Sequence, residues 1–513
     1  MPAEILKRVL RAPVYDVAVE TPLERAPQLS TRFQNHIWLK REDLQPVFSF
    51  KLRGAYNRMA QLTDDEKQAG VIAASAGNHA QGVALAAQQM GIAATIVMPK
   101  TTPPIKYRAV ERMGGKVVLH GDAFDEAKLH AEILRKEKNL TFIHPYDDLD
   151  VIAGQGTIAL EMLRQHSKPL DVVFVCVGGG GLISGIAAVF KQVSPKTRII
   201  GIEPEEAACL TKALEAGERV VLEQVGLFAD GVAVAQVGEI PFRIAQTCVD
   251  EMLTVSTDEI CAAIKDVFED TRAISEPAGA LAVAGMKKFV EKYQVSGLNM
   301  ACIVSGANIN FDRLRHISER TELGEKREAI FAVTIPERPG SFKQFCEILG
   351  GHRAITEFNY RFANPKNAVV FVGVRTESGT AERQAILTSL QQQGYDVVDM
   401  TDNEMAKLHL RHMVGGHANV SDCEPETFTE QLYRFEFPER PGALLKFLSH
   451  MSEEWNISLF HYRNHGAAYG RVLVGVQVPD NQQNDFEHYL QTLGYPYFNE
   501  SDNLGYQLFL QSR

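Results

Sequence analysis

The residue types that could carry out chemistry in this sequence gather around one lysine and three turns. Lys51 lies in the stretch SFKLRGAYN, at the expected start of a helix, because Leu52, Ala55 and Met59 recur at helical spacing and Ser49 is a suitable N-cap. The positive end of a helix is an unfavourable place for a purely structural cation. Because most single lysines are ordinary surface residues, the interpretation of Lys51 as a reactive amine depends on the three turns.

The first turn is a run of four glycines between an apolar segment, DVVFVCV, and a helical pattern that starts near Leu182. Residues without side chains allow a phosphate to approach backbone N–H groups at a helix N-terminus, where the helix dipole also favours an anion. We therefore predict a phosphate-binding loop that consists of Gly178, Gly179, Gly180, Gly181 and Leu182.

The glycine loop does not match the common nucleotide-binding motifs. No Gly-Lys-Ser/Thr follows it, which excludes a Walker A loop, and G-x-G-x-x-G cannot be placed on residues 178–185. Glu203, after the next apolar segment, has the position expected of a ribose-binding acid. A nicotinamide-binding interpretation therefore stays open on these residues alone.

The second and third turns place small polar side chains at the ends of apolar segments. In SAGNHAQG, the residues Ser75, Gly77, Asn78 and His79 precede a helical pattern and are suited to binding a carboxylate or an aromatic hydroxyl. In SGANIN, Ser305 ends an apolar segment. Each turn alone is more typical of helix capping, and a lone histidine such as His79 is more often packed than catalytic.

The lysine and the three turns together describe a site for pyridoxal phosphate. Lys51 would form the Schiff base, and the glycines would hold the phosphate. Asn78 would bind the ring hydroxyl, and Ser305 would face the pyridine nitrogen.

The segments between residues 38 and 310 can bring these groups together. Short runs rich in Val and Ile alternate with amphipathic helical stretches, which predicts a parallel sheet covered by helices on both faces. Ligands of such folds bind at the C-terminal ends of the strands, where all three turns lie. The predicted strands are 70–75, 94–99, 116–121, 171–178, 198–204 and 300–306.

The C-terminal third of the chain contains an internal repeat. IPERPGSFKQFCEIL, from Ile335, returns as FPERPGALLKFLSHM, from Phe437, and Pro438 minus Pro336 gives an offset of 102. Each copy has the order strand, helix, strand, strand, helix, strand, which is the ferredoxin-like plan. The charged stretch 318–329 is typical of a linker. We therefore expect a catalytic domain at 1–320, a small module at 329–403, a linker at 404–430 and a second small module at 431–513.

The bulk composition excludes several classes of partner. Lys and Arg number 53 against 64 Asp and Glu, a net charge of −11 without a basic run, so nucleic acid and anionic membranes are not expected partners. The N-terminus lacks the apolar core of a signal peptide, and no apolar run could span a bilayer. The seven cysteines are scattered, which suits a reducing cytoplasm, and no His or Cys spacing predicts a metal site.

On these motifs the chain resembles the fold-type II pyridoxal phosphate enzymes and, among them, the biosynthetic threonine dehydratase family. SFKLRGA is similar to the cofactor-lysine motif, SAGNHAQG to the substrate-carboxylate and cofactor loop, VGGGGL to the phosphate loop and SGANINF to the strand end at the pyridine nitrogen. IAGQGT and SEPAGA are also similar, although Gln155 and Glu276 receive no role. The resemblance implies an α/β fold-type II catalytic domain followed by two ferredoxin-like, ACT-like regulatory domains.

The resemblance also implies a reaction and its control. L-Threonine would lose its α-proton to the Lys51 amine and then its β-hydroxyl, which yields 2-oxobutanoate and ammonia in the committed step of isoleucine biosynthesis. Isoleucine would inhibit the enzyme and valine would activate it, through the paired modules of a homotetramer. The effector residues that we expect are Thr356, Glu357, Asn359, Ser458 and His461.

Other functions share part of this pattern. A serine dehydratase, a threonine synthase or a racemase of the same fold would keep Lys51 and the glycine loop, and the motifs alone do not define the side chain accepted. A non-catalytic amino-acid sensor would use the repeated modules but would have no need of a Schiff-base lysine. A nicotinamide oxidoreductase would be distinguished by its absorption spectrum, since pyridoxal phosphate bound to a lysine absorbs visible light and a bound nicotinamide does not.

Overall fold

The computed structural model describes residues 1–121, 124–311, 313–338, 340–349, 353–361, 366–403, 406–407, 410–412, 428–438, 443–449, 451–452, 455–463 and 469–503. The chain forms two compact units, Met1–Thr321 and Glu322–Arg513. No helix among the described residues is long and apolar enough to cross a membrane.

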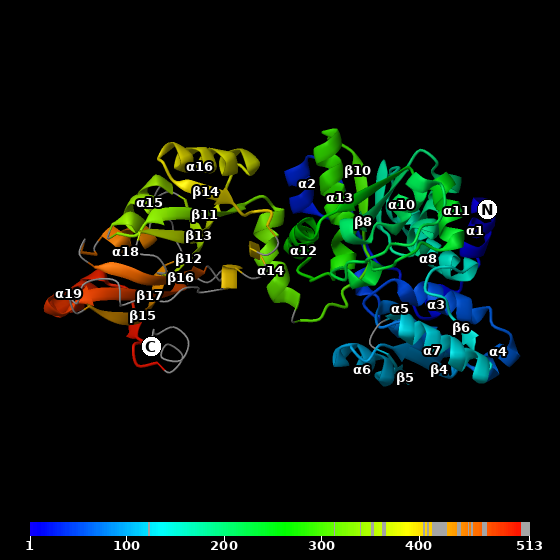
Figure 1. Ribbon diagram of the computed structural model, residues 1–513. Coiled ribbons are helices and arrows are strands. Elements are labelled where there is room, and N and C mark those ends of the chain that lie inside the picture. Colours follow the sequence, from blue (N-terminus) through cyan, green and yellow to red (C-terminus); the bar gives the residue numbers. More distant parts are fainter. Residues whose placement is uncertain are drawn as a thin grey trace. The chain divides into compact units, whose positions relative to one another are not determined.

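The first unit contains two sheets, each in its own lobe. The larger sheet has the order β1-β2-β10-β7-β8-β9, with all neighbours parallel except β1 and β2. The smaller sheet, in the blue-to-cyan lobe of Figure 1, has the parallel order β5-β4-β3-β6. The strands are β1 Leu23–Arg25, β2 His36–Arg41, β3 Val71–Ala74, β4 Ala94–Met98, β5 Lys116–Leu119, β6 Thr141–Phe142, β7 Val172–Cys176, β8 Arg198–Pro204, β9 Glu251–Val255 and β10 Asn299–Val304.

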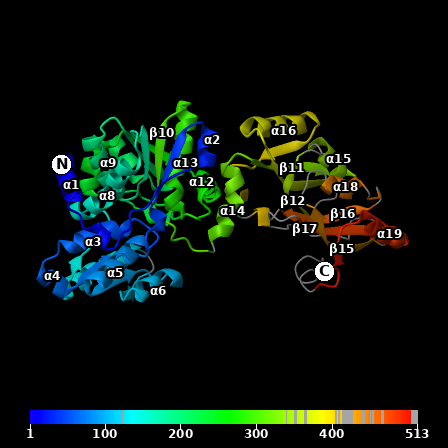
Figure 2. The same cartoon turned by 180° about the vertical axis from the view of Figure 1, so that it is seen from behind.

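Helices cover the sheets of this unit, as Figures 1 and 2 show from opposite sides. The six predicted strands are confirmed, and β7, whose residues are all buried, illustrates why a Val-rich run forms a central strand of a covered parallel sheet. The helices are α1 Pro2–Val9, α2 Pro27–Phe33, α3 Lys51–Ala60, α4 Asp64–Ala69, α5 Asn78–Met90, α6 Pro104–Arg112, α7 Phe124–Glu137, α8 Leu149–Gln165, α9 Gly181–Val193, α10 Cys209–Ala216, α11 Glu239–Cys248, α12 Thr257–Thr271, α13 Pro277–Tyr293 and α14 Arg313–Gly324.

Helix α3, which begins at Lys51, packs at backbone distance against two neighbouring helices. A Cβ atom on Gly82 of α5 would lie 3.0 Å from the carbonyl carbon of Lys51. A Cβ atom on Gly154 of α8 would lie 2.5 Å from the carbonyl oxygen of Arg53. Because no side chain separates the three backbones, the position of Lys51 is set by the two neighbouring helices.

A buried ionic cluster also holds α3 in place; it consists of Lys40, Glu42, Arg53 and Glu161, which are all 0% exposed. Arg53 donates from Nε to Glu42 Oε2 at 2.8 Å and from Nη1 to Glu161 Oε1 at 2.6 Å. Burial opposes its charge, yet these two carboxylates raise the pKa of Arg53. Two cations and two anions balance within the cluster, and removal of one partner would leave a buried charge uncompensated.

The described residues of the second unit form one antiparallel sheet of eight strands, in the order β14-β11-β13-β12-β16-β17-β15-β18. Its halves meet where β12 pairs with β16, and each half has the βαββαβ order, which confirms the predicted ferredoxin-like repeat. The strands are β11 Glu328–Pro336, β12 Ile355–Arg361, β13 Asn367–Arg375, β14 Asp396–Asp399, β15 Phe428–Pro438, β16 Asn456–Arg463, β17 Tyr469–Pro479 and β18 Tyr497–Asn499; the helices are α15 Ser341–Leu349, α16 Thr380–Gln392, α18 Ala443–Ser449 and α19 Gln483–Leu493.

The predicted linker at 318–329 contains the boundary between the two units, but most of it has regular secondary structure. Helix α14 continues to Gly324, and β11 already starts at Glu328. The many charged residues suggested an irregular segment, but they belong to an amphipathic helix: one side of α14 is polar, while Ile317 and Leu323 are buried. Most of the expected linker at 404–430 lies outside the described residues.

We predict that Gly154→Ala destabilises the first unit by about 2 kcal/mol, because the new methyl group would overlap the Arg53 carbonyl of α3. Urea unfolding followed by circular dichroism would measure the loss. Arg164→Ala, at an exposed position of the same helix, is the control and should change the free energy of unfolding by less than about 0.5 kcal/mol. Equal stability of both variants would contradict the close packing of α3 and α8.

Candidate cofactor and active site

The Lys51 side chain lies at the N-terminus of α3 and is held by two contacts. Its Nζ donates to the carbonyl oxygen of Pro145 at 3.0 Å and lies 5.3 Å from the centre of the Phe50 ring. Burial lowers the pKa of the Lys51 amine to about 8, although Cys176 and Glu276 nearby oppose this shift. About one-tenth of this amine is therefore unprotonated at pH 7, far more than for an ordinary lysine, and the unprotonated form is the one that acts as a nucleophile or base.

The predicted role of Ser49 as an N-cap was wrong. Phe50 is the N-cap of α3 and no side chain caps this helix. The Ser49 hydroxyl is fully buried and has no hydrogen-bond partner among the described residues. The backbone positions this segment instead, because Ser49 forms a bridge with Gly306 and the Phe50 N–H donates to the Ser305 carbonyl at 3.2 Å.

The glycine loop joins β7 to α9, and Gly180 has a φ of +89°, a conformation that favours glycine. The loop carbonyls accept hydrogen bonds from other residues, and the first N–H groups of α9, which have no partner within the helix, are suited to bind an anion. The carbonyls of Gly178, Gly179 and Gly180 accept bonds from Cys209 Sγ at 3.4 Å, Gly238 N at 3.1 Å and Ser184 N at 3.1 Å.

Tyr146 packs directly on this loop. A Cβ atom on Gly179 would lie 2.2 Å from the Tyr146 ring, and one on Gly181 would lie 3.0 Å from the Tyr146 backbone. Because Tyr146 is adjacent to Pro145, which accepts the bond from Lys51, the same segment contacts both the glycine loop and the lysine. The structure therefore brings these two predicted features to one place.

Ser305 follows the carboxyl end of β10, beside β7. Its Oγ donates to the Ala278 carbonyl at 3.3 Å, and its hydroxyl also bonds the thiol of Cys176, the last residue of β7. Burial raises the pKa of that thiol to about 11, so Cys176 stays neutral. An uncharged hydroxyl beside an uncharged thiol makes this wall of the site polar without charge.

Asn78 starts helix α5 and has two side-chain partners that the sequence analysis did not identify. Its Nδ2 donates to Glu276 Oε1 at 2.6 Å, and its Oδ1 accepts from Asn308 Nδ2 at 2.7 Å. SEPAGA and SGANIN, which carry these partners, were the available signals. Gln155, the other residue without an assigned role, accepts from the Gly54 N–H at 3.2 Å and so belongs to the packing of α3 and α8.

The turn before α5 borders open space. The Gly77 N–H donates to Ser75 Oγ at 3.3 Å, and a Cβ atom on Gly77 would meet nothing within 4 Å. His79, in contrast, is buried, with Nε2 2.8 Å from the Ile143 carbonyl. Burial lowers the pKa of His79 to about 3, so the ring is neutral and donates this bond. Only the backbone of His79 is left to assist in binding a substrate.

Glu203 is a helix cap, which removes the basis of the nicotinamide interpretation. Its carboxylate accepts from the Leu210 N–H at 2.8 Å, and from the N–H and hydroxyl of Thr211 at 2.9 and 2.6 Å. A buried carboxylate that satisfies the N-terminus of α10 is not presented to a ribose.

The expected effector residues lie on β12 and β16. Thr356 Oγ1 donates to Glu328 Oε1 at 2.5 Å, and Glu357 pairs with Arg411 at 3.1 Å. Asn359 shares this partner, because its Nδ2 donates to the Arg411 carbonyl at 3.1 Å. Asn359 is also the register partner of His461 across the β12–β16 junction, and Ser458 bonds Glu430 in the other half of the sheet.

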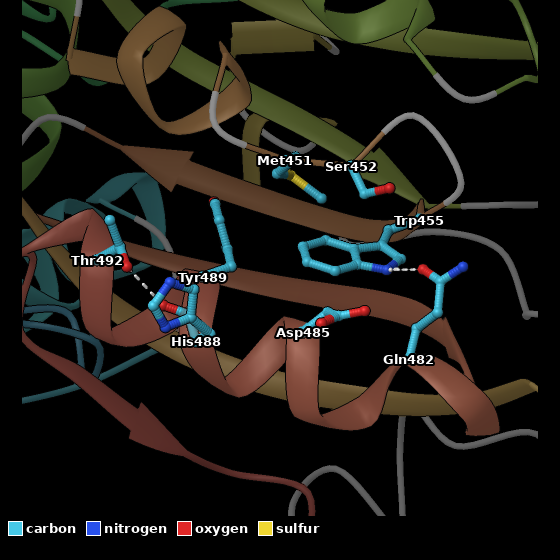
Figure 3. Close-up of a pocket in the computed structure, with 8 residues that line it drawn as sticks. All are labelled: Met451, Ser452, Trp455, Gln482, Asp485, His488, Tyr489 and Thr492. Carbon is cyan, nitrogen blue, oxygen red and sulfur yellow. Dashed lines mark hydrogen bonds between the residues drawn. The ribbon is translucent and has the colours of Figure 1, made fainter.

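A separate hollow of about 520 Å³ lies in the second unit, beside Trp455 and helix α19 (Figure 3). The Trp455 indole donates to Gln482 Oε1 at 2.7 Å. The described residues that line this hollow include none of the five expected effector residues. Among the described residues no group of three or more His, Cys, Asp or Glu side chains could hold a metal ion.

Comparison with known proteins agrees with this site. Residues 14–306 match the family of pyridoxal-phosphate dependent enzymes, and residues 319–410 and 422–510 match the C-terminal regulatory domain of threonine dehydratase. Fold and site thus define a fold-type II pyridoxal phosphate enzyme with a regulatory region.

Relatives that align with nearly the full length of this chain show which family of these enzymes it belongs to. The biosynthetic L-threonine dehydratase IlvA of Salmonella typhimurium is 55% identical over 99% of this chain and 97% of its own length, and a chloroplastic threonine dehydratase of Arabidopsis thaliana is 50% identical over 99% and 84%. The solved structure of processed threonine deaminase isoform 2 from Solanum lycopersicum has a TM-score of 0.61 and 52% identity, over 62% of this chain and 93% of that one. The chain belongs to the biosynthetic threonine dehydratase family.

The described residues fit pyridoxal phosphate. The Lys51 amine, the helix N-terminus with its side-chain-free loop and the Asn78 amide match the aldehyde, phosphate and ring hydroxyl of this cofactor. The Ser49 hydroxyl, buried without a partner, is a further polar atom that a bound ligand could satisfy.

We predict that Gly179→Ala weakens pyridoxal phosphate binding by about tenfold or more, because the methyl group would displace Tyr146 and with it the loop. Titration of the cofactor-free protein, followed by fluorescence, would give the dissociation constant. Val193→Ala, at the exposed far end of α9, should bind as the wild type does. Unchanged binding by the Gly179 variant would show that the phosphate lies elsewhere.

Proposed function

We propose that this chain converts L-threonine into 2-oxobutanoate and ammonia with pyridoxal phosphate, as the committed step of isoleucine biosynthesis. The observation that carries the proposal is full-length similarity, 55% identity over 99% of the chain, to a biosynthetic threonine dehydratase. The groups assembled around Lys51 support the same chemistry independently.

In the proposed reaction the bound cofactor supplies an electron sink for the bond broken at the α-carbon of the substrate. The Lys51 amine, with a pKa lowered to about 8, is suited to take the α-proton at Nζ. Its bond to the Pro145 carbonyl holds the amine in place. The backbone N–H groups at the glycine loop would hold the phosphate, and the turn at Ser75, Gly77 and Asn78 would bind the substrate carboxylate.

Ser305 favours elimination over transamination. The Ser305 hydroxyl, which donates its one proton to the Ala278 carbonyl, would have to rotate to donate it to an unprotonated pyridine nitrogen. An aspartate at this position would keep that nitrogen protonated. With Ser305 at this position the bound cofactor would supply a weaker electron sink, which would favour loss of the β-hydroxyl over transamination. The neutral surroundings of Ser305, which include the Cys176 thiol, support this role.

Two alternative functions have less support than threonine dehydration. A serine or threonine dehydratase of other specificity would use the same site, but the full-length relatives are named as threonine dehydratases. A non-catalytic sensor would not need an amine whose pKa burial lowers to about 8. We also infer a reducing compartment, the cytoplasm, since the six described cysteines are free and buried.

The paired modules are proposed to regulate the enzyme. We assign the ACT-like regulatory domains to residues 329–403 and 431–513, with isoleucine as inhibitor and valine as activator. Their match to the regulatory domain of threonine dehydratase supports this assignment. Control across a homotetramer requires that the effectors stabilise different states of the catalytic domains.

Lys51→Ala should abolish turnover and leave the fold intact, because the variant loses the proton acceptor and the covalent attachment of the cofactor. Keto-acid formation, circular dichroism and the visible absorption of the purified protein would be measured. Lys138→Ala removes an exposed lysine and is the control. Turnover at the wild-type rate in the Lys51 variant would refute its assignment.

The initial rate of 2-oxobutanoate formation should depend on threonine sigmoidally, and isoleucine should shift the curve to higher threonine concentrations. Serine at matched concentrations tests the specificity. A rate that does not respond to isoleucine would leave the enzyme assigned and remove the regulatory role of the modules. No keto acid from threonine would contradict the proposed function itself.

A further inference from the structure

Glu276 connects two of the turns that form the candidate site. It immediately precedes α13, is 3% exposed, and accepts from Asn78 Nδ2 at 2.6 Å. The backbone N–H of Asn308 also bonds its carboxyl group. One carboxyl therefore joins the start of α5 to the loop after β10.

Asn308 holds the opposite end of the same amide. Its Nδ2 donates to Asn78 Oδ1 at 2.7 Å and to the Val47 carbonyl at 2.8 Å. An asparagine amide has one acceptor oxygen and two N–H donors. Asn308 engages the Asn78 oxygen and Glu276 engages one N–H, and these two bonds set the orientation of the amide. The oxygen is thereby directed toward Asn308, and the second N–H is the group that Asn78 can offer to a further ligand.

The surrounding backbone makes room for the Glu276 carboxyl. A Cβ atom on Gly306 would lie 2.7 Å from Glu276 Oε1, and one on Gly231 would lie 3.4 Å from it. Gly279, in the first turn of α13, packs against the Gly306 backbone, because a Cβ there would lie 2.2 Å from the Gly306 carbonyl oxygen. Glycines thus line the space where the acidic side chain approaches the site.

A carboxyl in this place is costly, which argues against a role in packing alone. Burial, and then the charge of Asp230, raise the pKa of Glu276 to about 7, while Lys106 opposes the shift. The ionisable groups whose charges interact with the Glu276 carboxyl are Asp230, Lys106, Lys51 and Cys176. An apolar side chain would fill the same volume without this cost.

We propose that Glu276 is a positioning residue that holds the Asn78 amide so that it presents an N–H, and no acceptor, to the hydroxyl of the cofactor ring. This inference rests on the proposed role of Asn78 as the contact of that hydroxyl. A donor at this point stabilises the ionised ring oxygen over the neutral hydroxyl. Glu276 and Asn308 together determine which form of the cofactor the site holds.

The test compares Glu276→Gln with Glu276→Leu in the purified holoenzyme. Glutamine keeps a carbonyl oxygen that can accept from Asn78, so cofactor affinity should stay within about twofold of the wild type and the visible absorption band should be retained. Leucine removes the acceptor, so the dissociation constant of pyridoxal phosphate should rise about tenfold or more. Absorption should move from the visible to the near-ultraviolet band, with a pH dependence that the wild type lacks.

Two further variants separate positioning from general damage. Glu203→Leu removes another buried carboxyl of the same unit, a helix cap, and should lower stability without moving the absorption band. Asn308→Ala releases the Asn78 oxygen and should reproduce the spectral change, which keeps the inference testable if Glu276→Leu does not fold.

Three results would overturn the inference. The first is a folded Glu276→Leu variant with the cofactor affinity and absorption of the wild type. The second is an Asn308→Ala variant with the wild-type absorption spectrum. The third is an equal loss of cofactor affinity in the Gln and Leu variants, which would show that the charge of Glu276 matters and not its acceptor oxygen. None of these measurements uses threonine. A failure of the proposed function would therefore appear as absent turnover in the wild type, independently of cofactor spectra.

Discussion

The close approach of α3 to α5 and α8 is the constraint on which the candidate site depends. At Gly82 and Gly154 the backbones touch, so α3 cannot shift without moving both neighbours. Arg53 adds buried ion pairs to this contact, one with Glu161 on α8 and one with Glu42, which precedes α3 in the chain. Lys51 begins this helix, and its amine therefore has a defined place in the absence of any side-chain cap.

Burial shifts the ionisable groups around this amine toward their uncharged forms. The pKa values of Lys51 and His79 fall to about 8 and about 3, while those of Cys176 and Glu276 rise to about 11 and about 7. The cause is the same in each case, because low polarity penalises the charged form. A site of this kind relies on the helix dipole and oriented backbone N–H groups to hold an anion, and keeps an amine that exchanges protons near neutral pH.

The two halves of the second unit share a fold but differ in electrostatics. Thr356 bonds Glu328 in the first half, and Ser458 bonds Glu430 at the equivalent positions, 102 residues later. The next residue differs: Glu357 binds Arg411, whereas its counterpart Leu459 is an apolar core residue. Since the modules are joined along β12 and β16, one continuous sheet has two chemically distinct halves.

The sequence alone determined the parallel α/β unit, the repeated ferredoxin-like modules and the types of group at the site, because period, glycine runs and repeats are local signals. The sequence analysis failed where the role of a side chain depended on residues that are distant in the chain but adjacent in space. Ser49 has the chemistry of a cap, but the Gly306 strand end holds its segment, and Glu203 has the position of a ribose acid, but a later helix uses it. The role of Glu276 likewise depends on Asn78, 198 residues away in the chain. Only the tertiary structure decides which partner a polar side chain meets, since hydrogen bonds require contact in space and sequence spacing does not encode it.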